Sequence, residues 1–289
     1  MRAVTVIGAP TSAAAYAPGQ EDGPAAMREH GLLAALGGDV VDAGDVERFR
    51  WRPDPDRPRA ANAAAAAERA RQVAARVAAV PRERLALVLG GDCTTGVGTI
   101  AGLIARGDRP GLVYLDRHAD LNVPASTIEG ALDWMGVAHL LDVEGATQEL
   151  AGIAGSRPML TADRLAFLAL APVTPFETAE IERRRPHVVG LETAIADPEG
   201  AAREALAALD ADVLAVHFDV DVLDFRDAPL AENTDRAPGL PLASAGMALA
   251  TLCADPRVAA LTVTEFNPHH GAADGADTRR LIEVLAAAL

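Results

Sequence analysis

Residues 112–120 read Leu-Val-Tyr-Leu-Asp-Arg-His-Ala-Asp, so an apolar run ends directly in a cluster of polar side chains. The apolar part shows no alternation with polar residues, which is typical of a strand buried on both faces of a parallel sheet. Asp116, His118 and Asp120 follow at alternate positions, and side chains two apart on an extended backbone point the same way. Three polar groups against an apolar sheet would be costly without a partner. The segment therefore predicts a buried strand with a functional site at its carboxyl end.

The same kind of strand, separated by helical patterns, recurs along the chain. Further short apolar runs, the last of them weaker, are Val4–Ile7, Leu85–Leu89, Leu165–Leu170, Val213–Phe218, Ala260–Thr264 and Val188–Leu191. Helical patterns lie between them at Asn62–Val80, Pro198–Leu209, Pro241–Leu252 and Thr278–Leu289. Strands that alternate with helices predict an α/β protein, with helices on both faces of a central, mainly parallel sheet. We find no internal repeat and no linker, so we expect residues 1–289 to form one three-layer α/β/α domain.

The composition is that of a globular protein with an acidic surface. Of the 289 residues, 50% are hydrophobic and 23% are charged, and 41 acidic against 26 basic residues leave a net charge of −15. Such a surface repels phosphate groups, which argues against nucleic acids and anionic membranes as partners. No apolar run approaches the roughly 20 residues of a membrane span, and the first residues resemble a strand rather than a signal peptide. Two cysteines give no disulfide framework, so we expect a reducing cytoplasm.

Polar residues also follow three other predicted strands. Gly90-Gly91-Asp92-Cys93-Thr94 follows Leu85–Leu89, Asp219 and Asp221 follow Val213–Phe218, and Glu265 follows Ala260–Thr264. In open α/β sheets, ligands bind at the carboxyl ends of the strands. We therefore expect four strands to deliver carboxylates, an imidazole and a thiol to one edge of the sheet. His217 could face the same edge, but we expect a core histidine that is bonded to the backbone.

So many acidic groups in one place predict a metal centre. Carboxylates at close range cannot all stay ionised unless a cation neutralises them. Oxygen and imidazole ligands in this number suit two hard or borderline divalent ions, with Mn²⁺ as the natural candidate. Two ions about 3.5–4 Å apart can share a hydroxide, because water bound to them loses a proton near neutral pH. A single Asp at a strand end is more often a turn or cap residue, so this prediction depends on the whole set.

These motifs resemble the ureohydrolase family, which includes arginase, agmatinase, guanidinobutyrase and formimidoylglutamase. The resemblance begins at Gly19–Pro24 and Asp42–Asp45, and continues through Gly-Gly-Asp-Cys-Thr, Asp-Arg-His-Ala-Asp-Leu-Asn and Asp-Val-Asp-Val-Leu-Asp to Thr-Glu-Phe-Asn-Pro. It implies a three-layer α/β fold and two manganese ions per chain. It also implies that a hydroxide between the ions attacks the guanidino carbon of a small substrate, and that the chain forms a homo-oligomer, a trimer or a hexamer.

The resemblance also implies a role for each matching residue. Asp116 and Asp219 would bridge both ions, His118 and Asp221 would complete one site, and Asp120 and Cys93 would complete the other. Glu265 would hold the guanidinium group by a charge-assisted contact. Asp224 would orient the Asp-x-Asp loop without touching the ions. Asn122 and Ser126 would contact the head group of the substrate.

Three departures from the family's pattern affect the expected chemistry. Cys93 stands where the family has a histidine ligand. A metal-bound thiol is deprotonated, and its softer sulfur makes Zn²⁺ or Fe²⁺ possible. Asp133 stands where the family has a catalytic histidine that passes a proton to the leaving amine, and a carboxyl group can do so at neutral pH only if burial raises its pKa. The acidic segment with which arginase binds the amino-acid head is missing at Ala171–Glu177.

The first two departures together resemble a small branch of the family that hydrolyses N-hydroxy-arginine to hydroxyurea and ornithine. An N-hydroxyguanidine is less basic than a guanidine and its hydroxylamine-type nitrogen is easier to expel, so a strong general acid matters less. The predicted function is thus a metal-dependent amidinohydrolase for arginine, agmatine, a guanidino acid or N-hydroxy-arginine. Two alternatives stay open: an inactive protein of this fold that serves as a binding or regulatory subunit, and a hydrolase of formimino compounds.

Overall fold

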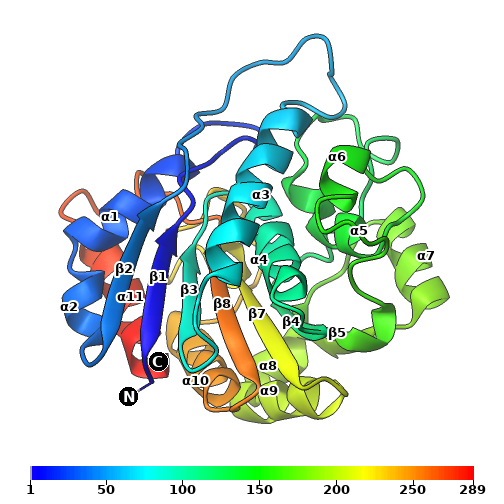
Figure 1. Cartoon of the computed structure of the whole chain (residues 1–289). Helices are drawn as coiled ribbons and strands as arrows, with labels where there is room; N and C mark the ends of the chain where they lie inside the picture. The colour runs from blue at the N-terminus through cyan, green and yellow to red at the C-terminus, as the bar shows by residue number, and fades with distance from the viewer. Residues whose placement is uncertain (1) are drawn as a thin grey trace.

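The computed structural model describes residues 2–289, and its centre is one sheet of eight parallel strands (Figure 1). The strands are β1 (Val4–Gly8), β2 (Val40–Asp45), β3 (Leu85–Leu89), β4 (Pro110–Leu115), β5 (Leu165–Leu170), β6 (His187–Gly190), β7 (Val213–Asp219) and β8 (Val258–Thr264). Their order is β2-β1-β3-β8-β7-β4-β5-β6, and every neighbouring pair is parallel. Every residue of β1, β3, β4 and β8 is buried, as expected for strands covered on both faces. The predicted α/β fold is confirmed.

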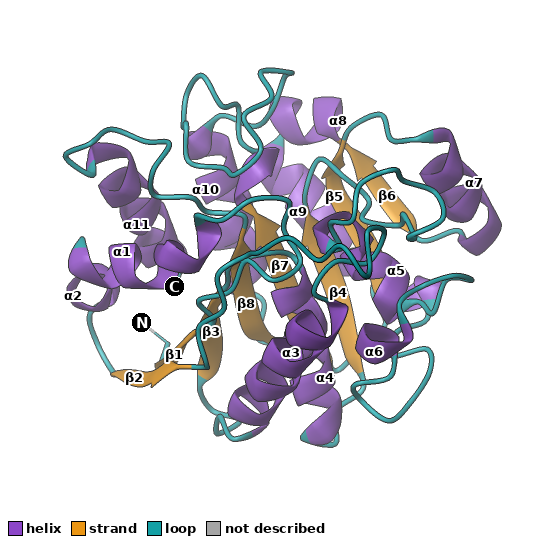
Figure 2. Ribbon diagram, turned by 90° about the horizontal axis from the view of Figure 1, so that it is seen from above, coloured by secondary structure: helices purple, strands orange, loops and turns teal. Residues whose placement is uncertain are grey.

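Helices cover both faces of the sheet and complete a three-layer arrangement (Figure 2). One layer contains α3 (Ala63–Ala78), α4 (Thr94–Ala105), α5 (Gly136–Leu140) and α6 (Gln148–Ala151), with α7 (Pro175–Arg184) beyond the β6 edge. The opposite layer contains α1 (Gly23–Glu29), α2 (Leu32–Leu36), α8 (Leu191–Ala196), α9 (Pro198–Ala207), α10 (Leu242–Cys253) and α11 (Ala276–Ala288). Short 3-10 helices occur at Gln20–Asp22, Asp133–Met135, Ala162–Arg164 and Val220–Val222.

The helix that begins at the predicted site, α4, packs tightly against α3 because small residues face each other. A Cβ atom at Gly98 would lie 2.6 Å from the carbonyl oxygen of Ala70. One turn further on, a Cβ atom at Gly102 would lie 2.7 Å from the carbonyl oxygen of Ala74. Both distances are shorter than a van der Waals contact, so only glycine allows the two helices to approach this closely.

The strand order explains why the polar motifs meet. β3, β8, β7 and β4 are consecutive in the middle of the sheet, and these are the four strands that end in the predicted polar residues. Because all strands run in the same direction, their carboxyl ends lie along one edge. The fold therefore places the four motifs next to one another at the centre of that edge, as the sequence predicts.

Candidate metal centre

The segment after β3 turns tightly into α4 and places Cys93 directly before the helix. The turn requires glycine at Gly91, because a Cβ atom there would lie 1.6 Å from the carbonyl oxygen of Thr11. Asp92 is fully buried and fixes the turn, since its carboxylate accepts a hydrogen bond of 3.1 Å from the backbone N–H of Ala14. The Cys93 side chain is consequently held in a buried position at the carboxyl edge of the sheet.

The segment after β4 contributes two carboxylates and an imidazole. Asp116 is fully buried and accepts a hydrogen bond of 2.7 Å from the backbone N–H of His118. The Nδ1 atom of His118 lies 3.4 Å from Asp116 Oδ1 and 3.2 Å from Asp221 Oδ2. Asp120 has a left-handed backbone, with φ of 49°, and its Oδ2 accepts a hydrogen bond from the hydroxyl group of Tyr114.

The segment after β7 brings two further carboxylates to the same place. Asp219 Oδ1 accepts a hydrogen bond of 2.7 Å from the backbone N–H of Asp221, which fixes the relative position of the two residues. Asp219 Oδ2 lies 2.8 Å from the sulfur of Cys93 and accepts its thiol hydrogen. All six residues that the sequence predicts as metal ligands are thus brought together from β3, β4 and β7.

The arrangement of donor atoms suits divalent cations. Three groups of side chains each offer ligand atoms within 4.8 Å of one another: Cys93, Asp116 and Asp120; Asp116, His118 and Asp221; and Cys93, His217 and Asp219. Within residues 2–289, Asp116 Oδ2 and Asp221 Oδ1 are buried and have no hydrogen-bond donor. Buried carboxylate oxygens without a donor are costly, and a bound cation removes that cost. The residues present therefore fit a metal centre with two neighbouring positions.

The electrostatics of the cluster favour the same conclusion. Burial and the negative charge of Asp221 raise the pKa of Asp116 to about 6. Burial and neighbouring carboxylates likewise raise the pKa of Asp120 and of Asp219 well above the usual value. Burial opposes a charge on His118, but Asp221 and Asp116 outweigh it and raise its pKa to about 12. Without cations, the cluster keeps protons that metal ions would displace.

The cluster forms the floor of an open cavity of about 420 Å³, which we call the acidic cavity. Its lining consists of Tyr16, Cys93, His118, Asp120, Asn122, Glu129, Asp133, Trp134, Pro172, Val173, Thr174, Glu177, Asp219, Asp221, Asn233 and Glu265. Asn122, Asp133 and Glu265, three of the residues predicted to act on the substrate, are among them. The lining contains no arginine, so negative charge dominates its interior.

Three predicted residues lie outside the lining of the acidic cavity: Ser126, Asp224 and the fully buried Asp116. The hydroxyl group of Ser126 donates a hydrogen bond of 2.9 Å to Asn122 Oδ1 and accepts one of 2.9 Å from the backbone N–H of Val123. Ser126 therefore holds Asn122 rather than facing the cavity directly. Asp224 accepts a hydrogen bond of 2.9 Å from the backbone N–H of Arg226, which stabilises the turn after the Asp-x-Asp motif.

Glu265 is held by two donors from distant parts of the chain. Its Oε1 accepts a hydrogen bond of 3.0 Å from the backbone N–H of Cys93, and its Oε2 accepts one from the amide Nε2 of Gln20. Gln20 is fully buried, and its Oε1 has no hydrogen-bond partner within the described residues. This contact was not predicted from the sequence, although Gln20 lies in the Gly19–Pro24 segment. Burial and the charges of Asp133 and other carboxylates raise the pKa of Glu265 well above its usual value.

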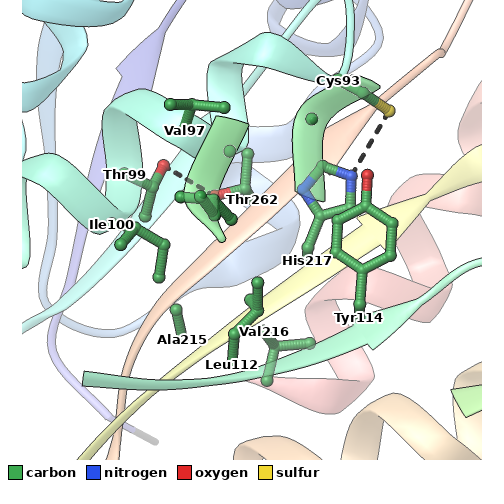
Figure 3. A pocket seen from close by; sticks show the side chains of 13 residues that line it. Cys93, Val97, Thr99, Ile100, Leu112, Tyr114, Ala215, Val216, His217 and Thr262 are labelled. Atoms are coloured by element: carbon green, nitrogen blue, oxygen red, sulfur yellow. Dashed lines mark hydrogen bonds between the residues drawn. The ribbon is translucent and has the colours of Figure 1, made fainter. Parts of the chain in front are cut away.

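His217 lines a second, small cavity, which shares Cys93 with the acidic cavity (Figure 3). It is buried as predicted, but its partners are side chains and not the backbone. Its Nε2 lies 3.4 Å from Cys93 Sγ and 3.0 Å from the hydroxyl oxygen of Thr264. Its ring stacks on Tyr114, with 4.2 Å between the ring centroids and 9° between the planes. Burial lowers the pKa of His217 to about 3, so the imidazole is neutral.

Comparison with known proteins places this geometry in a family. A family model described as "Arginase family" matches residues 2–289. The chain belongs to the arginase family. This arginase-family protein is 30% identical to arginase of Eremothecium gossypii over 287 residues, which cover 93% of this chain and 70% of that protein. It is 32% identical to arginase-1 of Homo sapiens over 181 residues, which cover 61% of this chain and only 56% of the human protein.

Solved structures agree with the arginase-family fold. The structure of arginase from Bacillus caldovelox matches 100% of this chain and 98% of its own, with a TM-score of 0.85 and 25% sequence identity. Formimidoylglutamase from Bacillus subtilis matches with a TM-score of 0.77 and 17% identity, which indicates a shared fold. The arginase-family protein has an arginase-like sheet of eight parallel strands with helices on both faces.

Proposed function

We propose that this arginase-family protein is a binuclear metal-dependent amidinohydrolase that cleaves a carbon–nitrogen bond of a guanidino or N-hydroxyguanidino compound. The observation that carries the proposal is the acidic cavity, where five of the six predicted ligands line the wall together with Glu265, and the sixth, Asp116, groups with them. An ion cluster next to a carboxylate is what cleavage of a cationic, planar substrate group requires, because the carboxylate orients the group over the ions.

We assign the ligands as the family resemblance implies. Asp116 and Asp219 would bridge the ions, His118 and Asp221 would complete one position, and Asp120 and Cys93 would complete the other. When bound, the ions would supply hydroxide from water near neutral pH and polarise the substrate. Manganese is the expected metal, and the soft sulfur of Cys93 makes Zn²⁺ or Fe²⁺ an alternative.

Glu265 would bind the guanidinium group. Its two oxygens each accept one hydrogen bond from the chain, through the Cys93 backbone and Gln20. A carboxylate accepts about four hydrogen bonds in total, so each oxygen retains a site for a substrate N–H group. The two contacts from the chain fix the plane of the carboxylate before the substrate arrives, which reduces the cost of binding.

Asp133 would protonate the leaving nitrogen. It lines the acidic cavity, and burial together with the charge of Asp92 raises its pKa well above the usual value. A carboxyl group that keeps its proton near neutral pH can act as a general acid. A raised pKa is the condition under which an aspartate can replace the histidine that protonates the leaving nitrogen in the family.

We further propose N-hydroxy-arginine as the preferred substrate within this class. The support is Cys93 as a ligand and Asp133 as the acid, both of which suit a leaving nitrogen that is easy to expel. Asn122, held by Ser126, would contact the head group from the cavity wall. Arginine, agmatine and guanidinobutyrate are the competing substrates.

Steady-state kinetics with these four compounds, on protein loaded with Mn²⁺, tests the proposal. We expect the highest kcat/KM with N-hydroxy-arginine, and hydroxyurea and ornithine as products identified by mass spectrometry. A higher kcat/KM for arginine would reject the substrate assignment. Two bound metal equivalents without turnover of any of the four compounds, or of formimino-glutamate, would favour a binding or regulatory protein instead.

Within residues 2–289, no helix is long and apolar enough to cross a bilayer. The family resemblance also leads us to propose a homo-oligomer, either a trimer or a hexamer. Sedimentation velocity tests this point directly, since a single species at the monomer mass would contradict it.

A further inference from the structure

We propose that His217, together with Thr264, is a positioning residue that donates hydrogen bonds to the Cys93 sulfur and so enables it to bind a metal ion as a thiolate. This inference rests on the proposed function, because it takes Cys93 as a ligand. It concerns a pair of residues behind the sulfur that contact neither the substrate nor the ions.

A thiolate at Cys93 would need hydrogen-bond donors. In the structure, Cys93 is a thiol that donates its hydrogen to Asp219 Oδ2 at 2.8 Å. A metal-bound cysteine has lost this hydrogen and can only accept hydrogen bonds. Asp219, itself an ionised ligand, cannot donate one. A buried thiolate at this position therefore needs donors from another direction.

His217 and Thr264 are the side chains that can donate hydrogen bonds to this sulfur. The Cys93 sulfur lies 3.4 Å from His217 Nε2 and 3.4 Å from the hydroxyl oxygen of Thr264. These two atoms are 3.0 Å apart, so the three form a compact triangle. Cys93 lines both the acidic cavity and the small cavity that His217 lines, and Figure 3 shows its sulfur beside the His217 ring.

Whether His217 can donate to the sulfur depends on which ring nitrogen carries the proton. A neutral imidazole carries one N–H group, on either Nδ1 or Nε2. Within the described residues, Nδ1 of His217 is buried without a partner, whereas Nε2 has two possible acceptors. A buried N–H without an acceptor is more costly and rarer than a ring nitrogen without a donor. The proton therefore belongs on Nε2, where it points towards Cys93 and Thr264.

Neighbouring residues hold the imidazole ring of His217 in place. His217 stacks on Tyr114, whose hydroxyl group donates to Asp120, another member of the ligand cluster. A Cβ atom at Gly96 would lie 2.5 Å from His217 Nδ1, so only glycine leaves room for the ring. These contacts hold the plane of the ring, and the hydrogen-bond partners at Nε2 favour the orientation in which Nε2 faces the sulfur.

A hydrogen bond to a coordinated sulfur withdraws electron density from it. The expected consequence is that the sulfur of Cys93 donates less charge to the metal ion and that its position beside the ion is fixed. Loss of a side chain that supports a ligand in this way typically weakens metal binding about 10–100-fold.

Cobalt-loaded protein provides the test, because a thiolate bound to Co²⁺ gives a sulfur-to-metal charge-transfer band. The variants His217→Gln and His217→Met are matched in length and both lose the aromatic ring, but only glutamine retains an N–H donor near the position of Nε2. We expect His217→Met to move the band to longer wavelength and to weaken one of the two cobalt sites about 10–100-fold. For His217→Gln, we expect the band position and the cobalt affinity to stay close to those of the unsubstituted protein.

Two further variants complete the set. Thr264→Val removes the second donor with little change in shape and should shift the band in the same direction. His139→Met removes another fully buried imidazole, one that lies outside the lining of both cavities, and should leave the band unchanged. Thermal melting of each metal-free variant shows whether it folds.

The possible failures are distinguishable. If unsubstituted cobalt protein lacks the band, Cys93 is not a ligand, and this overturns the metal assignment of the proposed function together with the inference. If the band is present and unchanged in His217→Met and Thr264→Val, only the inference is overturned. If His217→Met loses one ion completely and His217→Gln does not restore it, His217 is itself a ligand, which also overturns the inference.

A measurement on the unsubstituted chain keeps the inference testable even if His217→Met does not fold. The protein is prepared with isotopically labelled histidine and loaded with a magnetically active cadmium isotope. We expect NMR spectra to show His217 protonated at Nε2, with scalar coupling between that proton and cadmium through the hydrogen bond to sulfur. A His217 ring protonated at Nδ1 would contradict the inference.

Discussion

At the scale of single residues, the carboxyl group of Asp219 connects the segments that follow β3 and β7. One oxygen accepts the Asp221 backbone N–H at 2.7 Å, and the other accepts the Cys93 thiol at 2.8 Å. These contacts fix the orientation of the carboxylate, and each oxygen keeps a lone pair for a cation. Asp219 is thus positioned to bridge two ions before either is bound.

The variant Asp219→Ala should lose both ions and all measurable turnover, because it removes the proposed bridge. Elemental analysis after dialysis against Mn²⁺ gives the metal content. Asp255→Asn is the matched control, since Asp255 bonds to Arg257 before β8, at the opposite edge of the sheet. Retention of two ions by Asp219→Ala would contradict the bridging role.

The variant Gln20→Met should raise KM about tenfold or more, because a hydrogen bond to a charged group contributes roughly 1.5–3 kcal/mol. Methionine fills the buried space but cannot hold Glu265. We expect kcat to change less than KM, as for loss of a binding contact. Gln72→Met, at a glutamine on the exposed face of α3 that bonds to Glu68, is the control. An unchanged KM would show that Gln20 does not orient Glu265.

The variant Asp133→Asn should reduce kcat about 10²–10⁴-fold without loss of metal, because an amide cannot protonate the leaving nitrogen. In the unsubstituted protein, kcat should fall as pH rises through the raised pKa of Asp133, where the acid loses its proton. This alkaline decline should be absent in the variant. If the kcat of Asp133→Asn equals that of the unsubstituted protein and still declines at alkaline pH, another group protonates the leaving nitrogen.

The residues that carry chemistry were predictable where they follow a strand. Asp116, Asp219 and Glu265 stand directly after apolar runs; strand direction places them at one edge of the sheet, and strand order makes them neighbours there. The contact of Gln20 with Glu265 joins residues 245 positions apart and depends on how the N-terminal segment folds over the sheet. The partners of His217 were missed for the same reason, because a histidine inside an apolar run gives no indication of which side chains face it.

At the scale of elements, sequence patterns predicted strands best where they are fully buried. β2 (Val40–Asp45) was missed, because it is a partly exposed strand at the edge of the sheet and contains two Asp and a Gly. α4 (Thr94–Ala105) was also missed as a helix, since glycine and threonine favour helices poorly. Its glycines are needed for contact with α3, so packing overrides helix propensity there.

The variant Gly102→Val should destabilise the fold by about 1–3 kcal/mol, because the added side chain forces α4 away from α3. Urea unfolding of the metal-free protein measures the change. Ala105→Val places valine on an exposed position of the same helix and is the control; its cost in helix propensity is less than about 0.7 kcal/mol. Equal effects of the two variants would show that the helix contact is not tight.

At the scale of the whole molecule, the negative charge of the chain extends into its interior. The formal net charge is −15, and the acidic residues behind it include the buried cluster, beside which the lining of the acidic cavity offers no arginine. Metal ions would therefore serve the stability of the fold as well as the reaction. The alternation of strands and helices and the family resemblance make this architecture predictable, whereas the protonation of the cluster depends on burial that only the folded chain shows.

The metal-free protein should lose stability as pH rises from about 6.5 to 9. Burial raises the folded-state pKa values of Asp120, Asp219 and Glu265 well above their usual values, so the folded chain binds more protons than the unfolded chain in this range. His139 and His217 act in the opposite direction, but their pKa values of about 4 and 3 confine that effect to pH below about 6.5.

Thermal melting in the presence of a chelator, repeated with Mn²⁺, measures this pH dependence. The decline should be weaker with Mn²⁺, because the ions replace the protons. A metal-free melting temperature that is constant or rises above pH 6.5 would mean that the cluster does not hold these protons.

The central claim is that side chains from β3, β4 and β7 hold two divalent cations at the floor of the acidic cavity. Anomalous diffraction at the manganese absorption edge, from crystals grown with Mn²⁺, tests it most directly. We predict two anomalous peaks per chain, one beside Cys93 and Asp120 and one beside His118 and Asp221, with Asp116 and Asp219 between them. A map without peaks at these positions, despite excess Mn²⁺, would contradict the account.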